Sequence, residues 1–219
     1  MEPRWFTETD DEHSQWYSEH FRQLAIDGED LEGEARLLDA LVPPASTILD
    51  AGCGQGRTAG ALYRRGHRVF ALDIDPVLID AASDDNPGPT YIRTDLATMD
   101  LLRDFPAMEP FDAAVSAGNV LGFVAPGTEQ QVLSNIWRQL APDAPYVTGF
   151  HVDRYALTDF DRDLELAGFA LESRFATWDL RPWTPDDPSR SGPSAGSCPR
   201  SSQRRPSRPP QPPAARSRT

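Results

Sequence analysis

The sequence predicts an α/β fold with a doubly wound, mostly parallel sheet of the Rossmann-like type. Short apolar runs alternate with helix-like segments at intervals of ~20 to 30 residues, as expected for strands joined by helical crossovers. The glycine-rich turn GCGQG, residues 52–56, directly follows the first apolar run of this series. An aspartate ends each of the first three runs, at Asp50, Asp73 and Asp95. A chain of 219 residues is long enough to form one domain with a substantial core.

The elements are predicted in order from hydrophobic spacing and from cap residues. The N-terminal forty residues are expected to be helical, because Trp16, His20 and Leu24 follow an i, i+4 spacing. A second helix is expected from Asp30, as its N-cap, to Leu41. The strands are predicted at 47–50, 68–73, 90–95, 111–117, 145–150 and 169–178, and the intervening helices at 57–65, 75–82, 128–140 and 158–167. Right-handed crossovers place the carboxyl ends of the strands, where ligands bind, along one edge of the sheet.

Charge is distributed unevenly along the chain, which has a net charge of −13. All 34 acidic residues precede Pro188, whereas seven of the 21 basic residues follow it, so the body is strongly acidic and the tail is basic. An acidic body repels phosphate backbones, so no nucleic-acid partner is expected for it. Neither a signal peptide nor a membrane span is predicted, and we expect a cytoplasmic protein. Cys53 and Cys198 form neither a disulfide framework nor a metal site.

Composition changes abruptly after Asp187. The last 32 residues hold eight prolines, eight serines and seven arginines, and they contain no Val, Ile, Leu, Met, Phe, Tyr or Trp. Such a segment cannot bury enough apolar surface to offset the entropy cost of ordering it. We therefore predict a domain over residues 1–187 and a disordered tail over residues 188–219.

Three interpretations fit the glycine-rich turn: a structural turn, a dinucleotide site and an S-adenosylmethionine site. Gly54, Gly56 and Ala59 satisfy the G-x-G-x-x-A spacing of a dinucleotide site, with Asp73 at a suitable distance. Asp50 argues against it, because its carboxylate would face the pyrophosphate. At an effective dielectric constant of ~20, like charges ~5 Å apart cost about 3 kcal/mol.

S-adenosylmethionine has no phosphate and carries a sulfonium and an ammonium group, so a carboxylate at Asp50 favours this ligand. Asp73, at the end of the second strand, can accept hydrogen bonds from both ribose hydroxyls. Asp95, at the end of the third, can accept from the adenine amino group, and Ile74 and Leu96 can sandwich the adenine ring. The three aspartates together are more specific than the glycines alone.

The stretches LDAGCGQGR, HRVFALDIDP, YIRTDL and FDAAVSAGNV resemble a class I S-adenosylmethionine-dependent methyltransferase of the small bacterial type. The resemblance covers roughly residues 16–183. It implies that Asp73 binds the ribose, that Asp95 lies beside the adenine, and that residues 116–119 line the methionine end of the cofactor. The predicted cofactor-binding residues are Asp50, Ala51, Gly52, Cys53, Gly54, Gly56, Asp73, Ile74, Asp95, Leu96 and Ala117.

The resemblance implies in-line methyl transfer from S-adenosylmethionine to a small-molecule acceptor. A general base is needed only if the nucleophile arrives protonated. His151, after the fifth strand, is a candidate base or substrate-orienting residue, and a polar loop residue is the alternative interpretation. Trp16, Tyr17 and His20 are expected to pack. An NAD-dependent oxidoreductase and a non-catalytic or damaged relative are the alternative functions.

The family ends in a seventh, antiparallel strand, which forms a hairpin with the sixth strand and inserts beside the fifth. The tail lacks the apolar alternation of such a strand, so we expect this last strand to be missing. One hypothesis is a shifted reading frame near Asp187 or Pro188, and the other is a genuine basic tail.

Overall fold

The computed structural model describes residues 1–184 and 200–203, and its strands form one sheet in the order β3-β2-β1-β4-β5-β7-β6. Neighbouring strands from β3 to β5 are parallel, and β7 is antiparallel to both of its neighbours. This arrangement confirms the predicted doubly wound, mostly parallel fold. The strands are β1 (Thr47–Ala51), β2 (Arg68–Asp73), β3 (Thr90–Arg93), β4 (Ala113–Ser116), β5 (Pro145–Thr148), β6 (Phe169–Ser173) and β7 (Arg200–Gln203).

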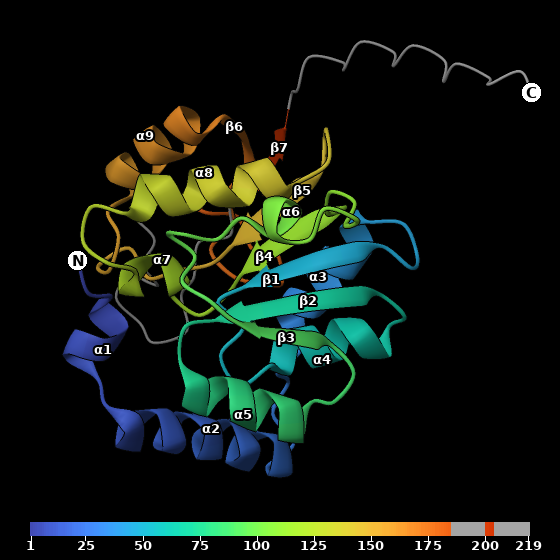
Figure 1. Cartoon of the computed structure of the whole chain (residues 1–219), viewed down its shortest axis with the longest axis vertical. Coiled ribbons are helices and arrows are strands. Elements are labelled where there is room, and N and C mark those ends of the chain that lie inside the picture. Colours follow the sequence, from blue (N-terminus) through green and yellow to red (C-terminus); the bar gives the residue numbers. More distant parts are fainter. Residues whose placement is uncertain (185–199, 204–219) are drawn as a thin grey trace, which may run out of the picture.

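Helices cover both faces of the sheet (Figure 1). One face packs on α3 (Gly33–Leu41), α4 (Arg57–Arg64) and α5 (Pro76–Asp85). The other packs on α6 (Leu101–Asp104), α8 (Glu129–Gln139) and α9 (Leu157–Ala167). Successive side chains of a strand point to opposite faces, so the central strands must be apolar on both. In β1, Ile48 belongs to the core on the side of α3, α4 and α5, and Leu49 belongs to the core on the side of α6, α8 and α9.

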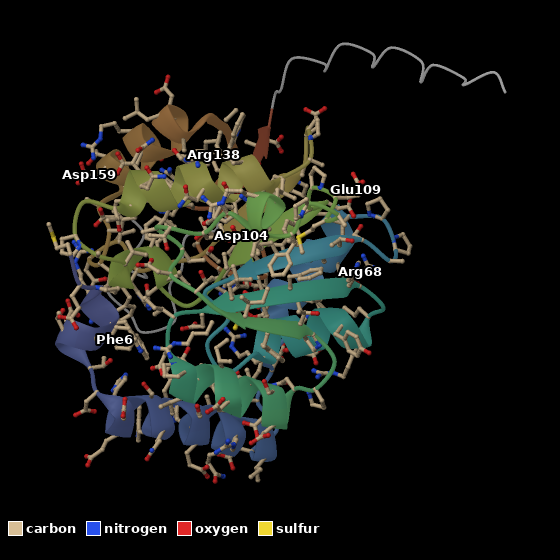
Figure 2. The ribbon with its side chains drawn as sticks, viewed as in Figure 1. Phe6, Arg68, Asp104, Glu109, Arg138 and Asp159 are labelled. Atoms are coloured by element: carbon tan, nitrogen blue, oxygen red, sulfur yellow. The ribbon has the colours of Figure 1, made fainter. Side chains whose placement is uncertain are left out.

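Three further helices lie near the carboxyl ends of the strands. α1 (Arg4–Glu8) lies beside α7 (Val120–Phe123), and α2 (Asp11–Ile26) packs along α5. Figure 2 shows Phe6, on α1, and Arg68, at the amino end of β2, on opposite sides of the molecule. The N-terminal helices therefore stand at the edge of the sheet where ligands bind in this type of fold.

The N-terminal region is broken into three helices rather than two. α3 begins at Gly33, with Glu32 in the cap position, so Asp30 is not its N-cap. Instead, Asp30 Oδ1 accepts a hydrogen bond from the Glu32 amide at 3.2 Å, and the carboxylate pairs with Arg36. β6 also ends at Ser173, five residues before the predicted end at Trp178.

The prediction that the last antiparallel strand is missing is wrong. β7 lies between β5 and β6, with Ser201 opposite Tyr146 on one side and Leu171 on the other. The prediction relied on side-chain alternation, whereas an inserted strand is held by backbone hydrogen bonds to both neighbours. The predicted disorder of the tail otherwise lies outside the described residues. No helix in the described ranges is long and apolar enough to cross a membrane.

Candidate functional site

A cavity of about 600 Å³ opens at the carboxyl ends of β1, β2, β3, β4 and β5. This volume is within the range of small-molecule and cofactor sites. The structure brings ten of the predicted site residues to its wall: Asp50, Gly52, Cys53, Gly54, Asp73, Ile74, Asp95, Leu96, Ala117 and His151. Ala51 and Gly56 do not line the cavity.

The glycine turn is shaped by positive φ angles and by close packing. Gly52, Gly54 and Gly56 have φ values of 88°, 55° and 80°. A Cβ atom on Gly52 would lie 2.4 Å from a methyl group of Val120. A Cβ on Gly56 would lie 2.6 Å from the hydroxyl oxygen of Tyr91. Gly52 therefore lets α7 approach the cavity, whereas Gly56 lets α4 begin against β3, behind the cavity wall.

Asp73 is held in place by the backbone on both sides. The Gly54 amide donates to Oδ2 at 2.8 Å, and the Asp75 amide donates to Oδ1 at 3.0 Å. Burial raises the pKa of Asp73 to about 6, although these amide donors oppose the shift. Each carboxylate oxygen can still accept a further hydrogen bond, as a vicinal diol such as ribose requires.

Asp50 is buried in the wall of the same cavity. Its side-chain Oδ2 has no hydrogen-bond partner among the residues that the structure describes. Burial raises the pKa of Asp50 to about 7, and the Arg57 guanidinium opposes this rise. A buried carboxylate oxygen without a partner is costly, and a cationic or hydrogen-bonding ligand would satisfy it.

The third acidic strand end is organised by its own turn. Asp95 Oδ1 accepts a hydrogen bond from the Ala97 amide at 2.8 Å, which forms an Asx turn. The carbonyl of Leu96 accepts from Asn135 Nδ2 at 2.8 Å, so α8 holds this turn in place. Ile74 and Leu96 both line the cavity, as the adenine prediction requires.

His151 reaches the cavity through a contact that the sequence did not predict. Asn119 has a left-handed backbone with φ of 68°, and its amide donates to the Gly149 carbonyl at 3.2 Å. Its side-chain Oδ1 accepts from the His151 amide at 2.5 Å. Asn119 thus joins the segments that follow β4 and β5. Asparagine adopts this left-handed conformation more readily than other non-glycine residues, which suits it to this tight turn.

Aromatic side chains of the N-terminal helices form one wall of the cavity, and the sequence analysis identified only some of them. Trp16 and Tyr17, expected to pack, line the cavity together with Trp5, His13 and Phe21. His20 instead stacks on Trp16, with ring centroids 5.2 Å apart. The indole of Trp5 packs edge-on against Tyr17 and Phe123. Trp5 follows no periodic pattern in the sequence, which is why it was missed.

The site is electrostatically negative. In residues 1–184, Arg57 is the only arginine that lines the cavity, and both of its terminal nitrogens bind the Glu34 carboxylate. The carboxylates of Asp50, Asp73 and Asp95 face the cavity without an ion pair from that part of the chain. Such a site attracts a cation and repels a pyrophosphate.

The fold, the glycine turn and the acidic strand ends define an S-adenosylmethionine-dependent methyltransferase, and the chain belongs to that family. Residues 48–143 match the family model described as a methyltransferase domain. The chain is 38% identical to a TehB-like S-adenosylmethionine-dependent methyltransferase from Corynebacterium glutamicum, with a TM-score of 0.78 over 89% of this chain and 100% of that one.

Two further comparisons agree with this family. The CcbJ methyltransferase of Streptomyces caelestis shares the fold, with a TM-score of 0.64 and 15% identity over 79% of this chain and 90% of that one. Magnesium-protoporphyrin O-methyltransferase of Rhodobacter capsulatus is 38% identical over 79 residues, 36% of this chain. That match spans only 34% of the relative's length.

The cofactor is therefore S-adenosylmethionine, and the residues present fit it. The partnerless Oδ2 of Asp50 suits a cationic ligand, and the fixed carboxylate of Asp73 suits a diol.

Proposed function

We propose that the protein transfers the methyl group of S-adenosylmethionine to a small-molecule acceptor. The buried, partnerless oxygen of Asp50 supports the cofactor part of this proposal, because it lies in a cavity that Asp73 and Asp95 also line. A ligand with a cationic end and a ribose fits this row of carboxylates. A ligand with a pyrophosphate does not.

Each predicted cofactor-binding residue that lines the cavity has a role in this proposal. Asp50 binds the α-ammonium group, Asp73 accepts from the ribose hydroxyls, and Asp95 accepts from the adenine amino group. The remaining predicted residues of the cavity wall provide the surface around the cofactor: the adenine lies between Ile74 and Leu96, and the methionine part lies against Gly52, Cys53, Gly54 and Ala117.

The acceptor lies at the ends of β4 and β5, because the cofactor occupies the ends of β1 to β3. Asn119, Phe150, His151 and Trp178 line this part of the cavity. The cofactor supplies an activated methyl group, so the protein has to align the nucleophile and exclude water. His151 takes the proton from an acceptor that arrives protonated, or else orients it.

Binding experiments test the cofactor assignment. In calorimetry, S-adenosylhomocysteine should bind and NADH should not. Asp73→Ala should weaken S-adenosylhomocysteine binding at least tenfold, because both ribose hydroxyls lose their acceptor. Asp84→Ala, at an exposed position on α5, is the matched control and should not change the affinity. An unchanged affinity for Asp73→Ala would remove the ribose role of this residue.

A screen of metabolites for tritium transfer from labelled cofactor tests the activity itself. His151→Gln should lower kcat more than tenfold for an acceptor that must lose a proton, with little change in cofactor affinity. Equal activity of wild type and His151→Gln over the whole pH range would exclude His151 as a base. Binding of S-adenosylhomocysteine without transfer to any acceptor would favour a non-catalytic relative.

A further inference from the structure

We infer that Asp75 is a positioning residue that fastens the N-terminal helices over the cofactor cavity and connects them to the ribose-binding acid. Its two carboxylate oxygens have separate partners. Oδ1 accepts from the amides of Val77 and Leu78 at 2.8 and 3.4 Å, which caps α5. Oδ2 accepts from the indole nitrogen of Trp5 at 2.7 Å and from the hydroxyl of Ser14.

The cap explains only one of these oxygens. An N-cap needs a single acceptor for the free amides of the first helical turn. The partners of Oδ2 come from α1 and α2, 70 and 61 residues earlier in the chain. Asp75 is only 2% exposed, so water does not compete with these two donors while the helices stay in place. Hydrogen bonds to a buried carboxylate are among the stronger kinds in proteins.

The same residue touches the cofactor site through its backbone. The Asp75 amide donates to Oδ1 of Asp73, whose Oδ2 accepts from the Gly54 amide. Asp73 and Asp75, two residues apart, thus join four parts of the site: α1, α2, the start of α5 and the glycine turn. No other carboxylate in the described part of the chain combines these partners.

Opening of the cavity must break this contact. Trp5 lines the cavity, and its ring packs against Tyr17 and Phe123 from two other parts of the wall. If Trp5 and Ser14 leave Asp75, the aromatic wall separates from the strand ends. The Asp75 contact therefore holds the cavity closed, and on the proposed function it slows the release of cofactor and of its product.

The double variant Trp5→Phe/Ser14→Ala tests this inference. It removes both donors to Oδ2 and keeps an aromatic ring in the wall and the cap of α5. The matched control is Trp137→Phe/Ser83→Ala, which removes an indole donor and a serine hydroxyl away from the cavity. Asp75→Asn is a second variant: its amide oxygen can still cap α5, but its amide nitrogen cannot accept from the indole.

Hydrogen exchange of the ligand-free protein is the first measurement, and it does not depend on the proposed cofactor. The amides of α1 and α2 should exchange at least tenfold faster in the double variant and in Asp75→Asn, while those of β1 and β4 keep the wild-type rate. The control should match wild type. Unchanged exchange in α1 and α2 of the variants would overturn the inference, as would equal acceleration throughout the protein.

Dissociation of S-adenosylhomocysteine is the second measurement. Stopped-flow displacement should show an off-rate at least fivefold higher in the double variant than in wild type or control. If wild type does not bind S-adenosylhomocysteine, the proposed function fails, and the exchange result alone decides the role of Asp75. If it binds and the off-rates are equal, the contact does not control release, and the inference is wrong.

Discussion

At the residue scale, the ionisation of Asp50 connects ligand binding to pH. Its pKa of about 7 in the ligand-free protein means that much of the population is protonated just below neutrality. A cationic ligand binds the ionised form, so binding at lower pH must release this proton. We expect the affinity for S-adenosylmethionine to fall as pH decreases below about 7, by up to about tenfold per pH unit. Calorimetry between pH 5.5 and 8.5 measures this, and Asp50→Asn should bind more weakly with a flatter profile.

Asp50 also makes the stability of the ligand-free protein depend on pH. Low pH weakens ligand binding but favours the stability of the ligand-free fold. The pKa of Asp50 is raised from 3.8 in the folded state, so the folded protein binds more protons than the unfolded chain between about pH 4 and 7. The contribution of Asp50 to stability therefore falls as pH rises through this window. Asp50→Asn should raise the melting temperature at pH 8 and do so less at pH 5. A melting temperature difference that does not vary with pH would contradict the raised pKa.

At the scale of elements, the approach of α7 to the glycine turn depends on Gly52. Gly52→Ala must adopt a positive φ and displace Val120, which the new Cβ would meet at 2.4 Å. Gly66→Ala is the matched control, since Gly66 has φ of 94° and no atom within 4 Å of its Cβ position. The control should lose roughly 1–2 kcal/mol of unfolding free energy from the backbone alone. Gly52→Ala should lose about 1–3 kcal/mol more from overpacking. Equal losses of unfolding free energy for the two variants, measured by urea unfolding, would show that Val120 can move aside without cost.

The strand-turn-helix units were predictable because their signals are local. Asp50 and Asp73 are separated from the helices that follow them by only a few residues. The proline after Asp75 indicates that Asp75 is the N-cap of α5. The tie from Asp75 to Trp5 and Ser14 was not predictable, because neither donor has a sequence signal that points to a residue 61 or 70 positions away. The bridge from Asn119 to His151 was missed for the same reason.

At the scale of the whole molecule, the sheet is completed by a strand whose sequence is Arg-Ser-Ser-Gln. The pairing of β7 with β5 and β6 is made by its backbone, which hydrophobic periodicity does not reveal. The sequence thus predicted the parallel part of the sheet from apolar runs, but not the strand that contains none. The resemblance to the methyltransferase family implied a strand in this place, whereas the composition of the tail argued against it.

Substitution in β7 tests whether this strand contributes to the stability of the fold. Ser201→Pro removes an amide from a strand that has neighbours on both sides, and a sheet partner then loses a donor. We expect a loss of about 1–3 kcal/mol of unfolding free energy. Ser201→Ala keeps the amide and should change the free energy much less. If both variants unfold at the same urea concentration, the pairing of β7 does not stabilise the protein.

The position of β7 also has a consequence for biosynthesis. β5 and β6 leave the ribosome before the strand that separates them, because 26 residues lie between the end of β6 and the start of β7. During that interval β5, whose other neighbour is β4, presents an unpaired edge of backbone donors and acceptors. Exposed strand edges recruit other chains, and late, non-local pairing is slow. The nascent chain is therefore most prone to aggregate just before β7 is made, and it should depend on chaperones at that stage.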